Sequence, residues 1–322
     1  MRRHFRGADH SLEEWSPVSL HGLPLACTMA RMPPLSLRQI ILLVLLTIIW
    51  GINWPVMKMA VQHFPPLSFR AVSMWVALPL IALVLRYQGV PLAIPRSFWP
   101  QLLVLAVPNM VMWHCLVISA IPMLSSGRAA ILGFSMPIFS AVIGWLVYQE
   151  RLAVRAWAGV IAALLGVVLL LWHEVAAMGS QPVGVFLMLL AAANWALGTQ
   201  LLRRARMPVP LLAVAFWMVA IGAAALTIAA VLLERNQWHV PNTPALAAIV
   251  FNGVLVLAFA QIVWFYLARS LPPIASTLSV MFIPVLGVFT GAWWLGEVLH
   301  WQDWTAVGLM VVAIASVLWP RR

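Results

Sequence analysis

The sequence has few charged residues for its length. Charged side chains make up 8% of its 322 residues, whereas a soluble domain carries about 25%. Hydrophobic residues make up 64%, and the mean hydropathy is +0.98. This composition excludes an ordinary soluble domain and indicates a polytopic helical membrane protein. The net charge of +11 therefore needs a membrane explanation before a nucleic-acid one.

Acidic residues and cysteines are scarce as well. The acidic residues fall in the N-terminal tail, in loops or at helix ends: Asp9, Glu13, Glu14, Glu150, Glu174, Glu234, Glu297 and Asp303. Without a carboxylate in the middle of a span, proton antiport of the small multidrug type is disfavoured, although His114 could still couple transport to protons. Cys27 lies in the tail and Cys115 in an apolar run, so we expect no disulfide.

Motifs for ATP use, metal binding and enzyme chemistry are missing. No Gly-x4-Gly-Lys-Ser/Thr sequence is present to cradle phosphates, and no group of His, Cys, Asp and Glu has the spacing of metal ligands. The loops are too short to hold a catalytic domain. We therefore expect no cofactor, no metal and no enzyme activity. A membrane-embedded enzyme and a scaffold or receptor are the less favoured alternatives.

Ten apolar runs are each long enough to cross a bilayer core of about 30 Å. We predict spans at 38–61, 67–86, 98–120, 124–148, 154–172, 183–202, 209–233, 244–268, 272–296 and 303–320. Residues 1–37 are expected to form a disordered cytosolic tail rather than a cleavable signal peptide. Met29 and Met32 are alternative starts to Met1.

Arginine positions give these spans a direction, because cytosolic loops carry an excess of Lys and Arg. With a cytosolic N-terminus, only Arg235 falls outside. Twelve arginines near span ends then fall inside: Arg31, Arg38, Arg86, Arg96, Arg151, Arg155, Arg203, Arg204, Arg206, Arg269, Arg321 and Arg322. We therefore expect a multi-pass protein of the inner (cytoplasmic) membrane with both termini in the cytosol.

An internal repeat divides the chain into two halves. The segment "MPIFSAVIGWLVYQERLAVRAW" at 136–157 aligns without gaps with "IPVLGVFTGAWWLGEVLHWQDW" at 283–304, an offset of 147 residues. The repeat spans five helices, an odd number, so the second half crosses the membrane in the opposite sense. Inverted repeats of this kind mark secondary transporters, with the substrate site near the midplane between the halves.

The predicted fold is therefore an all-α membrane protein. It has ten transmembrane helices, arranged as two inverted five-helix repeats at 38–173 and 182–320 after the tail at 1–37. Pro137 matches Pro284 across the repeats and Glu150 matches Glu297. These four residues, with Arg70 and Arg128, are the candidates for structural or gating roles: Arg70, Arg128, Pro137, Glu150, Pro284 and Glu297.

Several segments of the chain resemble a known family. "LTIIWGINWPVMK", "PPLSFRAVSMWVALPL" and the twice-used "P…GE/QE-x-L…W…G" pattern are similar to the EamA family of the drug/metabolite transporter superfamily. The resemblance covers about residues 38–320. It implies ten helices, cytosolic termini and export of small metabolites such as amino acids through a cavity between the repeats. One departure is "YQER" at 148–151, where the family usually has a glycine before the glutamate, as "LGEV" does in the second copy.

Uncharged polar residues inside the spans are the main candidates for a substrate site. A single buried Asn more often joins helices than binds a ligand, but several concentrate in a few spans. Helical spacing places Trp50 with Asn53, and Asn109 with Trp113, on shared faces. With aromatic neighbours, these residues predict a polar cavity suited to small amphipathic metabolites. The candidates are Trp50, Asn53, Lys58, Asn109, Trp113, His114, Asn194, Gln261 and Trp264.

The basic and acidic residues in or beside the spans each have two interpretations. Lys58, the only lysine, either extends its amine to the membrane interface or faces the cavity and meets a substrate carboxylate. Arg70 and Arg128 either anchor the outer ends of helices or contact a gate. Glu150 and Glu297 oppose the helix dipole, so we expect fold-holding ion pairs with basic partners, such as Arg151 or Arg155 for the first.

The matched prolines predict symmetric bends that line the cavity. Pro137 and Pro284 each remove one backbone donor, and a carbonyl freed in this way needs a partner or a watery cavity inside the membrane.

The sequence thus predicts a secondary transporter that exports small metabolites, most of all amino acids, by alternating access. Proton-coupled multidrug or organic-cation efflux is the alternative. The expected partners are a small-molecule substrate and membrane lipid, and we expect no nucleic acid. The oligomeric state is left open, a monomer included.

Overall fold

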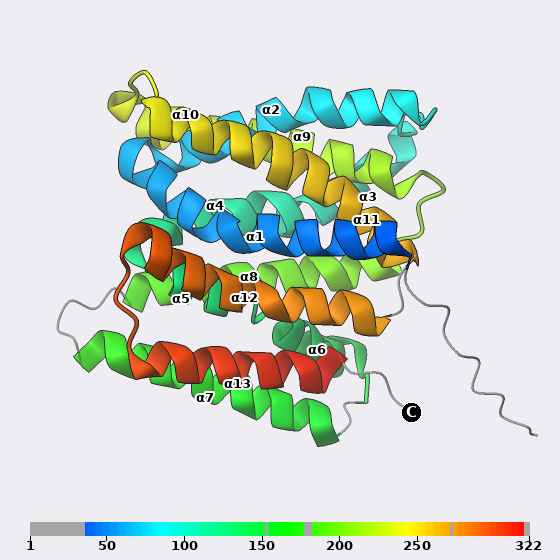
Figure 1. Cartoon of the computed structure of the whole chain (residues 1–322). Helices are drawn as coiled ribbons and strands as arrows, with labels where there is room; N and C mark the ends of the chain where they lie inside the picture. The colour runs from blue at the N-terminus through cyan, green and yellow to red at the C-terminus, as the bar shows by residue number, and fades with distance from the viewer. Residues whose placement is uncertain (1–35, 152–153, 177–181, 271–272, 319–322) are drawn as a thin grey trace, which may run out of the picture. The chain divides into compact units, whose positions relative to one another are not determined.

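The computed structural model describes residues 36–151, 154–176, 182–270 and 273–318, and every regular element in these ranges is a helix (Figure 1). The elements before residue 177 are α1 (Leu37–His63), α2 (Pro66–Tyr87), η1 (Arg96–Phe98), α3 (Trp99–Ala106), η2 (Val107–Met112), α4 (Trp113–Ala120), η3 (Ile121–Met123), α5 (Ser126–Gly133), α6 (Met136–Tyr148) and α7 (Val154–Ala176). The elements that follow are α8 (Pro182–Arg204), α9 (Leu211–Glu234), η4 (Arg235–Gln237), α10 (Thr243–Val250), η5 (Phe251–Ala260), α11 (Gln261–Ser270), α12 (Pro273–Leu295) and α13 (Trp301–Leu318). The predicted tail lies outside the described residues apart from its last two.

Local signals set where several helices begin. α1 starts with a capping box, in which the Ser36 hydroxyl accepts from the Gln39 N–H and the Gln39 side chain accepts from the Ser36 N–H. α2 begins at Pro66, where the missing N–H costs no intrahelical bond. Ser125 and Asn242 cap α5 and α10, each accepting from an N–H three residues later. The short connections therefore also supply the helix caps.

Seven helical stretches in the described ranges are long and apolar enough to cross a membrane: Leu37–His63, Pro66–Tyr87, Arg96–Met123, Ser126–Tyr148, Pro182–Arg204, Leu211–Gln237 and Thr243–Trp264. Val154–Leu170 and Phe282–Leu295, the apolar parts of α7 and α12, are shorter. Large hydrophobic side chains stay exposed along these helices, as expected of surfaces that face lipid. Each predicted span falls on helical segments, and the count of ten crossings stays a prediction.

The fourth predicted span is broken into two helices. α5 ends at Gly133 and α6 begins at Met136. Pro137 therefore lies in the first turn of α6, directly after this break, where proline is tolerated. Pro284 does lie inside α12. The matched prolines therefore occupy different positions in their helices.

In both copies of the repeat, the matched helix ends in the same kind of turn. Gln149 after α6 and Gly296 after α12 both have a left-handed backbone, with φ values of 56° and 66°. The N–H of Glu150 donates to the Gly144 carbonyl six residues earlier, and the matched pair in the second copy does the same. In each copy, a carbonyl near the end of the helix thus receives a partner from beyond the turn. The first copy therefore keeps a backbone conformation that favours glycine, but with a glutamine in that position.

A pair of π-helical segments also corresponds between the copies. η2 and η5 are both π-helical. The repeat offset maps residues 107–112 of η2 onto 254–259, inside η5. π-Helical turns are rare and are often found at functional sites. The region between these two segments is therefore a candidate for a functional site.

Helices far apart in the sequence pack side by side. α13 packs along α7, α9 along α2, and α12 along α1; α7 and α13 lie together at the lower edge of the view in Figure 1. The approach of α12 to α1 depends on Gly51, because a Cβ there would lie 2.5 Å from the Leu286 Cβ. Three apolar clusters result. One joins α1 with α5 and α12, one joins α2 with α3 and α9, and one joins α1 with η5 and α11.

Candidate functional site

A cavity of about 710 Å³ lies where the three apolar clusters meet. Its walls come from α1, α2, η2, α4, α6, α8, α9, η5 and α11, so both halves of the chain contribute. Seven of the predicted substrate-binding residues line it: Trp50, Asn53, Asn109, Trp113, His114, Gln261 and Trp264. The structure thus brings together residues that lie more than 200 positions apart in the sequence.

One stripe of α1 forms a wall of the cavity. Trp50, Asn53, Trp54 and Met57 all line it, and their spacing of three, four and seven residues places them on one face of the helix. Ala60, one turn beyond Met57, is fully buried in the apolar core. The cavity wall on α1 therefore ends near Met57.

Two tryptophan pairs form aromatic walls. The rings of Trp50 and Trp264 have centroids 5.7 Å apart, and those of Trp113 and Trp195 are 5.1 Å apart. Each pair joins one helix of the first half to one of the second half. Tilted aromatic pairs at these distances are favourable. Trp195 was not among the candidates, although Trp195 and Arg203 follow Trp50 and Lys58 by the same 145 residues, which was a usable signal.

The buried part of the cavity contains a charged group. Arg70 on α2 lines the cavity with a relative exposure of 2%. Its Nη1 donates to Asn252 Oδ1 at 3.1 Å, and its Nη2 contacts the Met57 sulfur. Its Nε has no hydrogen-bond partner among the described residues. Arg70 therefore lies deep in the protein, near the start of α2, and contacts both η5 and α1.

Two other cavity residues have unpartnered buried atoms. Asn53 Oδ1 and His114 Nδ1 form no hydrogen bond within the described part of the chain. Burying a polar group without a partner costs roughly 1–3 kcal/mol in proteins. Together with Arg70 Nε, three buried polar atoms of cavity-lining residues therefore have no hydrogen-bond partner in the part of the chain that the structure describes.

The cavity reaches the surface at the end of the bundle that carries Glu150, Arg151, Arg203 and Arg204, which we call the arginine end. Glu150, Arg151 and Arg203 line the cavity, and both arginines are exposed. Arg204 pairs with Glu150 at 2.6 Å, with both side chains more than a third exposed. Glu150 thus has the basic partner that we expected, and Arg204 supplies it.

Gln200 joins two helices beside this opening. Its Nε2 donates to the Ser140 carbonyl of α6 at 2.7 Å, and its Oε1 accepts from Arg204 at 2.5 Å. The Arg204 guanidinium also lies over the Tyr148 ring, 3.5 Å from its centroid. A single arginine therefore links α8 to the end of α6 where the cavity meets solvent.

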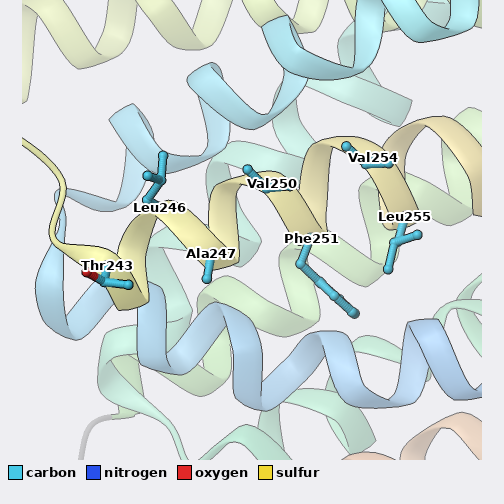
Figure 2. A pocket seen from close by; sticks show the side chains of 7 residues that line it. All are labelled: Thr243, Leu246, Ala247, Val250, Phe251, Val254 and Leu255. Atoms are coloured by element: carbon cyan, nitrogen blue, oxygen red, sulfur yellow. The ribbon is translucent and has the colours of Figure 1, made fainter.

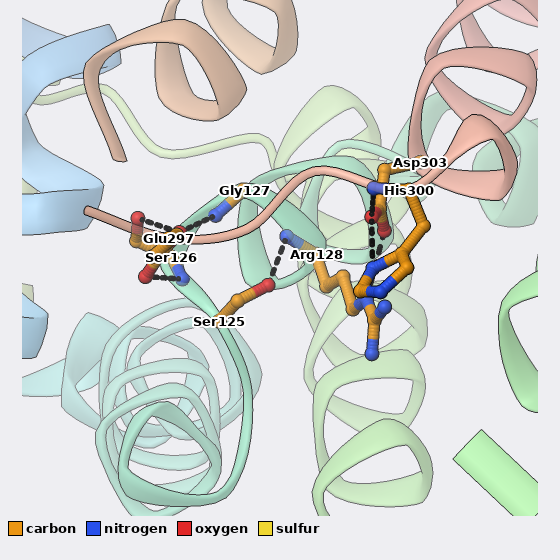
Figure 3. Close-up of polar contacts among 7 residues, drawn as sticks. All are labelled: Ser125, Ser126, Gly127, Arg128, Glu297, His300 and Asp303. Carbon is orange, nitrogen blue, oxygen red and sulfur yellow. Dashed lines mark hydrogen bonds and ion pairs between the residues drawn. The ribbon is translucent and has the colours of Figure 1, made fainter. Parts of the chain in front are cut away.

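The opposite end is held by carboxylates bound to helix starts, and we call it the capped end: Ser68, Ser126, Arg128, Glu234, Glu297 and Asp303. Glu297 accepts from the Ser126 N–H at 2.7 Å, the Ser126 hydroxyl at 2.8 Å and the Gly127 N–H at 3.3 Å (Figure 3). Carboxylates are favourable at a helix N-terminus. Glu297 therefore caps α5, and it forms no salt bridge with a residue that the structure describes, whereas we expected an ion pair.

An ion pair between a partly buried arginine and a buried aspartate lies next to this cap. Arg128 Nε donates to Asp303 Oδ1 at 2.8 Å, and the Asp303 side chain is 4% exposed (Figure 3). The other oxygen of Asp303 accepts from the His300 N–H at 2.9 Å. Arg128 thus joins α5 to the start of α13 and does not line the cavity.

Glu234 caps a second helix in the same way. It is 6% exposed and accepts from the N–H groups of Leu67 and Ser68 at 2.9 and 2.8 Å, and from the Ser68 hydroxyl at 2.7 Å. Trp238 donates to that hydroxyl as well. The end of α9 is thereby fixed to the start of α2.

Lys58 and Asn194 are not among the residues that line the cavity. Lys58 Nζ donates to the Ile121 and Pro122 carbonyls at 3.0 and 2.9 Å, at the end of η3. A lysine bound to the last carbonyls of a helix is a favourable C-terminal contact. Asn194 donates to the Leu190 carbonyl of its own helix. The structure thus separates these two candidates from the other seven.

A second hollow is a groove beside α10 and η5 (Figure 2). It is lined by Thr243, Leu246, Ala247, Val250, Phe251, Val254 and Leu255. Thr243 supplies its one polar side chain. The groove therefore lacks the charged and amide groups that make the central cavity chemically selective.

A model of the "EamA-like transporter family" matches the chain twice, over residues 37–172 and 182–319. The inner membrane transporter YedA of Escherichia coli (strain K12) is 28% identical over 276 residues, which cover 84% of this chain and 88% of YedA. A protein named "Probable amino-acid metabolite efflux pump" from Salmonella typhimurium (strain LT2) is 25% identical over 275 residues, covering 82% of this chain and 89% of that protein. A crystal structure at 20% identity has a TM-score of 0.63 and covers 87% of this chain and 96% of its own, which shows a shared fold.

Proposed function

This chain belongs to the EamA-like transporter family, and we propose that it exports small metabolites, above all amino acids, across the inner membrane by alternating access. The observation that carries the proposal is the central cavity. Its volume of about 710 Å³ lies within the range of roughly 300–1,000 Å³ that holds small molecules. It combines tryptophan walls with amide, imidazole and guanidinium groups, and it reaches the surface at the arginine end.

The proposed architecture is ten membrane spans in two inverted repeats. The double family match, the shared turn at Gln149 and Gly296, and the corresponding π-helical segments support it. In an inverted arrangement, the matched turns lie at opposite ends of the bundle. Glu150 at the arginine end and Glu297 at the capped end fit this arrangement.

The arginine end is proposed to face the cytosol, as the arginine excess in cytosolic loops requires. The structure then corresponds to a state open to the cytosol, and the capped end faces outward. Export would require the helix caps at Glu297 and Glu234 to separate while the arginine end closes. YedA is named an inner membrane transporter, which supports the same membrane for this chain.

We assign substrate contacts to the seven predicted residues that line the cavity: Trp50, Asn53, Asn109, Trp113, His114, Gln261 and Trp264. Lys58, Asn194 and Arg128 are assigned to holding the fold. The name of the Salmonella relative supports amino-acid metabolites as cargo. Since the family and these relatives are transporters, we propose transport without enzyme activity.

Uptake into liposomes that contain the purified protein tests this function. A panel of labelled amino acids, nucleosides and organic cations would be offered with and without a pH gradient. Saturable, competable uptake of an amino acid is expected, and uptake that needs no gradient would establish a facilitative carrier. Strict dependence on the gradient would instead point to His114, whose Nδ1 is unpartnered within the described residues, as the proton carrier. Absence of uptake for every panel member would overturn the proposal.

A further inference from the structure

We propose that Arg70 binds a carboxylate of the transported substrate, so that substrates must carry an anionic group and simple organic cations are excluded. This inference rests on the proposed transport function and assigns its substrate class. From the sequence alone, Arg70 is predicted to anchor a helix or to contact a gate. Its position in the cavity, its unpaired charge and the charges around it carry the inference.

Arg70 is a buried cation without a matching anion. Among the described residues, no carboxylate forms an ion pair with it. Its neutral neighbours Asn252 and Met57 accept from two of the five N–H groups that a guanidinium carries. Its Nε has no partner. A buried charge left uncompensated is strongly unfavourable, and an anion in the cavity would supply the missing charge.

The charges of the cavity wall favour anions. Arg70, Arg151 and Arg203 line the cavity, and Glu150 is the acidic residue among the lining residues. That glutamate is paired with Arg204, which lies outside the lining set. A wall of this sign attracts anions from the arginine end and repels cations. Organic-cation efflux, the alternative considered from the sequence, would depend on Glu150, the carboxylate among the described lining residues, which Arg204 already pairs.

The geometry of Arg70 suits a carboxylate. A guanidinium binds a carboxylate through two parallel N–H···O bonds, and the Nε edge is the part of this group without a protein acceptor. Arg151 and Arg203 lie at the exposed end of the cavity, so the buried part offers one arginine. One guanidinium, with paired N–H donors and one positive charge, matches a singly charged carboxylate.

Asn53 provides a second contact suited to an amino acid. Met57, which the Arg70 guanidinium touches, lies one turn from Asn53 on the same stripe of α1, and such positions have Cβ atoms about 5–6 Å apart. The Asn53 Oδ1 is buried and unpartnered, so it can accept from a substrate ammonium. Arg70 and Asn53 could thus hold the carboxylate and amine of one α-amino acid.

The competing explanation is purely structural, because Arg70 also joins α2 to α1 and η5. The two explanations differ in whether binding depends on the ligand's charge. A test therefore compares L-leucine, L-phenylalanine and L-threonine with their own carboxamides, which keep the amine and side chain but lack the carboxylate. Binding is read as the shift in thermal denaturation of the purified full chain, and transport as competition with amino-acid uptake into liposomes.

We expect at least one acid to stabilise the wild-type protein about tenfold more effectively, by concentration, than its carboxamide, as loss of a charged hydrogen-bond pair predicts. Arg70→Gln should abolish this preference. Arg70→Lys should keep part of it, since lysine has the positive charge but not the paired N–H donors of a guanidinium. Arg235→Gln is the matched control, because it removes the same charge from an exposed residue outside the cavity.

Equal stabilisation by acid and carboxamide, or an unaltered preference in Arg70→Gln, would overturn the inference. The wild-type comparison decides even where Arg70→Gln fails to fold. Binding that prefers the acid through Arg70 without uptake into liposomes would overturn the transport function and leave the anion site standing. Uptake of amino acids and their carboxamides at equal rates would overturn the anion site and leave the transport function standing.

Discussion

The two ends of the helix bundle use acidic residues in different ways. At the capped end, Glu234, Glu297 and Asp303 bind backbone N–H groups or the partly buried Arg128, and Glu234 and Asp303 are almost inaccessible. At the arginine end, Glu150 pairs with Arg204 while both remain more than a third exposed. Glu150 and Glu297 occupy matching positions of the repeat, so the difference comes from their surroundings.

This difference shows how a repeated sequence can make a molecule with one closed and one open end. A buried carboxylate on a helix start has several short hydrogen bonds and contributes much more than an exposed ion pair, which is worth about 0–1 kcal/mol. The capped end is therefore held firmly and the arginine end weakly. Movement between the two states of a transporter would exchange these environments.

Asp303→Asn should have the largest effect on stability. Removing one partner of a buried pair leaves the other charge without this compensation, which costs about 3 kcal/mol, and the His300 N–H loses an ionised acceptor. We expect a clearly lower midpoint of thermal denaturation in detergent. A midpoint equal to that of the wild type would contradict the view that the capped end is the firm one.

Glu297→Gln and Glu150→Gln make a matched pair that tests the comparison most directly. Glu297 accepts three hydrogen bonds at the start of α5, so its neutral replacement should cost about 2 kcal/mol. Glu150→Gln should cost about 0.5 kcal/mol or less, because its ion pair is exposed. Both would be measured by thermal denaturation. Equal costs would show that the matched residues have equivalent roles.

Lys58→Met should lower stability by about 1–2 kcal/mol, because it removes a charged donor from the Ile121 and Pro122 carbonyls. The preference for an amino acid over its carboxamide should stay as in the wild type, since Lys58 does not line the cavity. Denaturation and competition experiments on the same preparation give both results. A lost preference with unchanged stability would return Lys58 to the substrate site.

Gln149→Gly should raise stability by about 1 kcal/mol, because glycine adopts a left-handed backbone without the strain of a side chain. Gly296→Ala should lower it by a similar amount. No heavy atom lies within 4 Å of the Cβ position at Gly296, so that cost would report backbone conformation alone. Opposite signs in the two variants would confirm that the two copies share one turn, and the same sign would contradict it.

Many of the helices could be predicted from the sequence, because seven stretches in the described ranges are apolar runs of the length that a membrane needs. The break between α5 and α6 could not, since Pro137 is compatible with either a kink or a new first turn. Seven of the nine predicted substrate-binding residues line one cavity, because polar and aromatic residues in apolar spans seek a shared interior. Helical spacing also carried information about Lys58: it follows Asn53 by five residues, which is about 140° around the helix.

Arg70 shows what the sequence could not supply. Its place near the start of a span is equally typical of an anchor at the membrane surface. Its position in the cavity depends on Asn252, 182 residues later, and no local pattern predicts that pairing. The caps at Glu234 and Glu297 were missed for the same reason, because each carboxylate binds the start of a helix more than 160 residues away.

The single lysine has a practical consequence. Lys58 is the only lysine in the sequence, and both of its hydrogen bonds tie its amine to carbonyls of η3. An acylating reagent needs the free lone pair of an unprotonated amine, so the side chain must leave those carbonyls before it reacts. Its rate of acylation therefore measures how often this part of the molecule comes apart. Mass spectrometry of one peptide would read this rate with and without a transported compound.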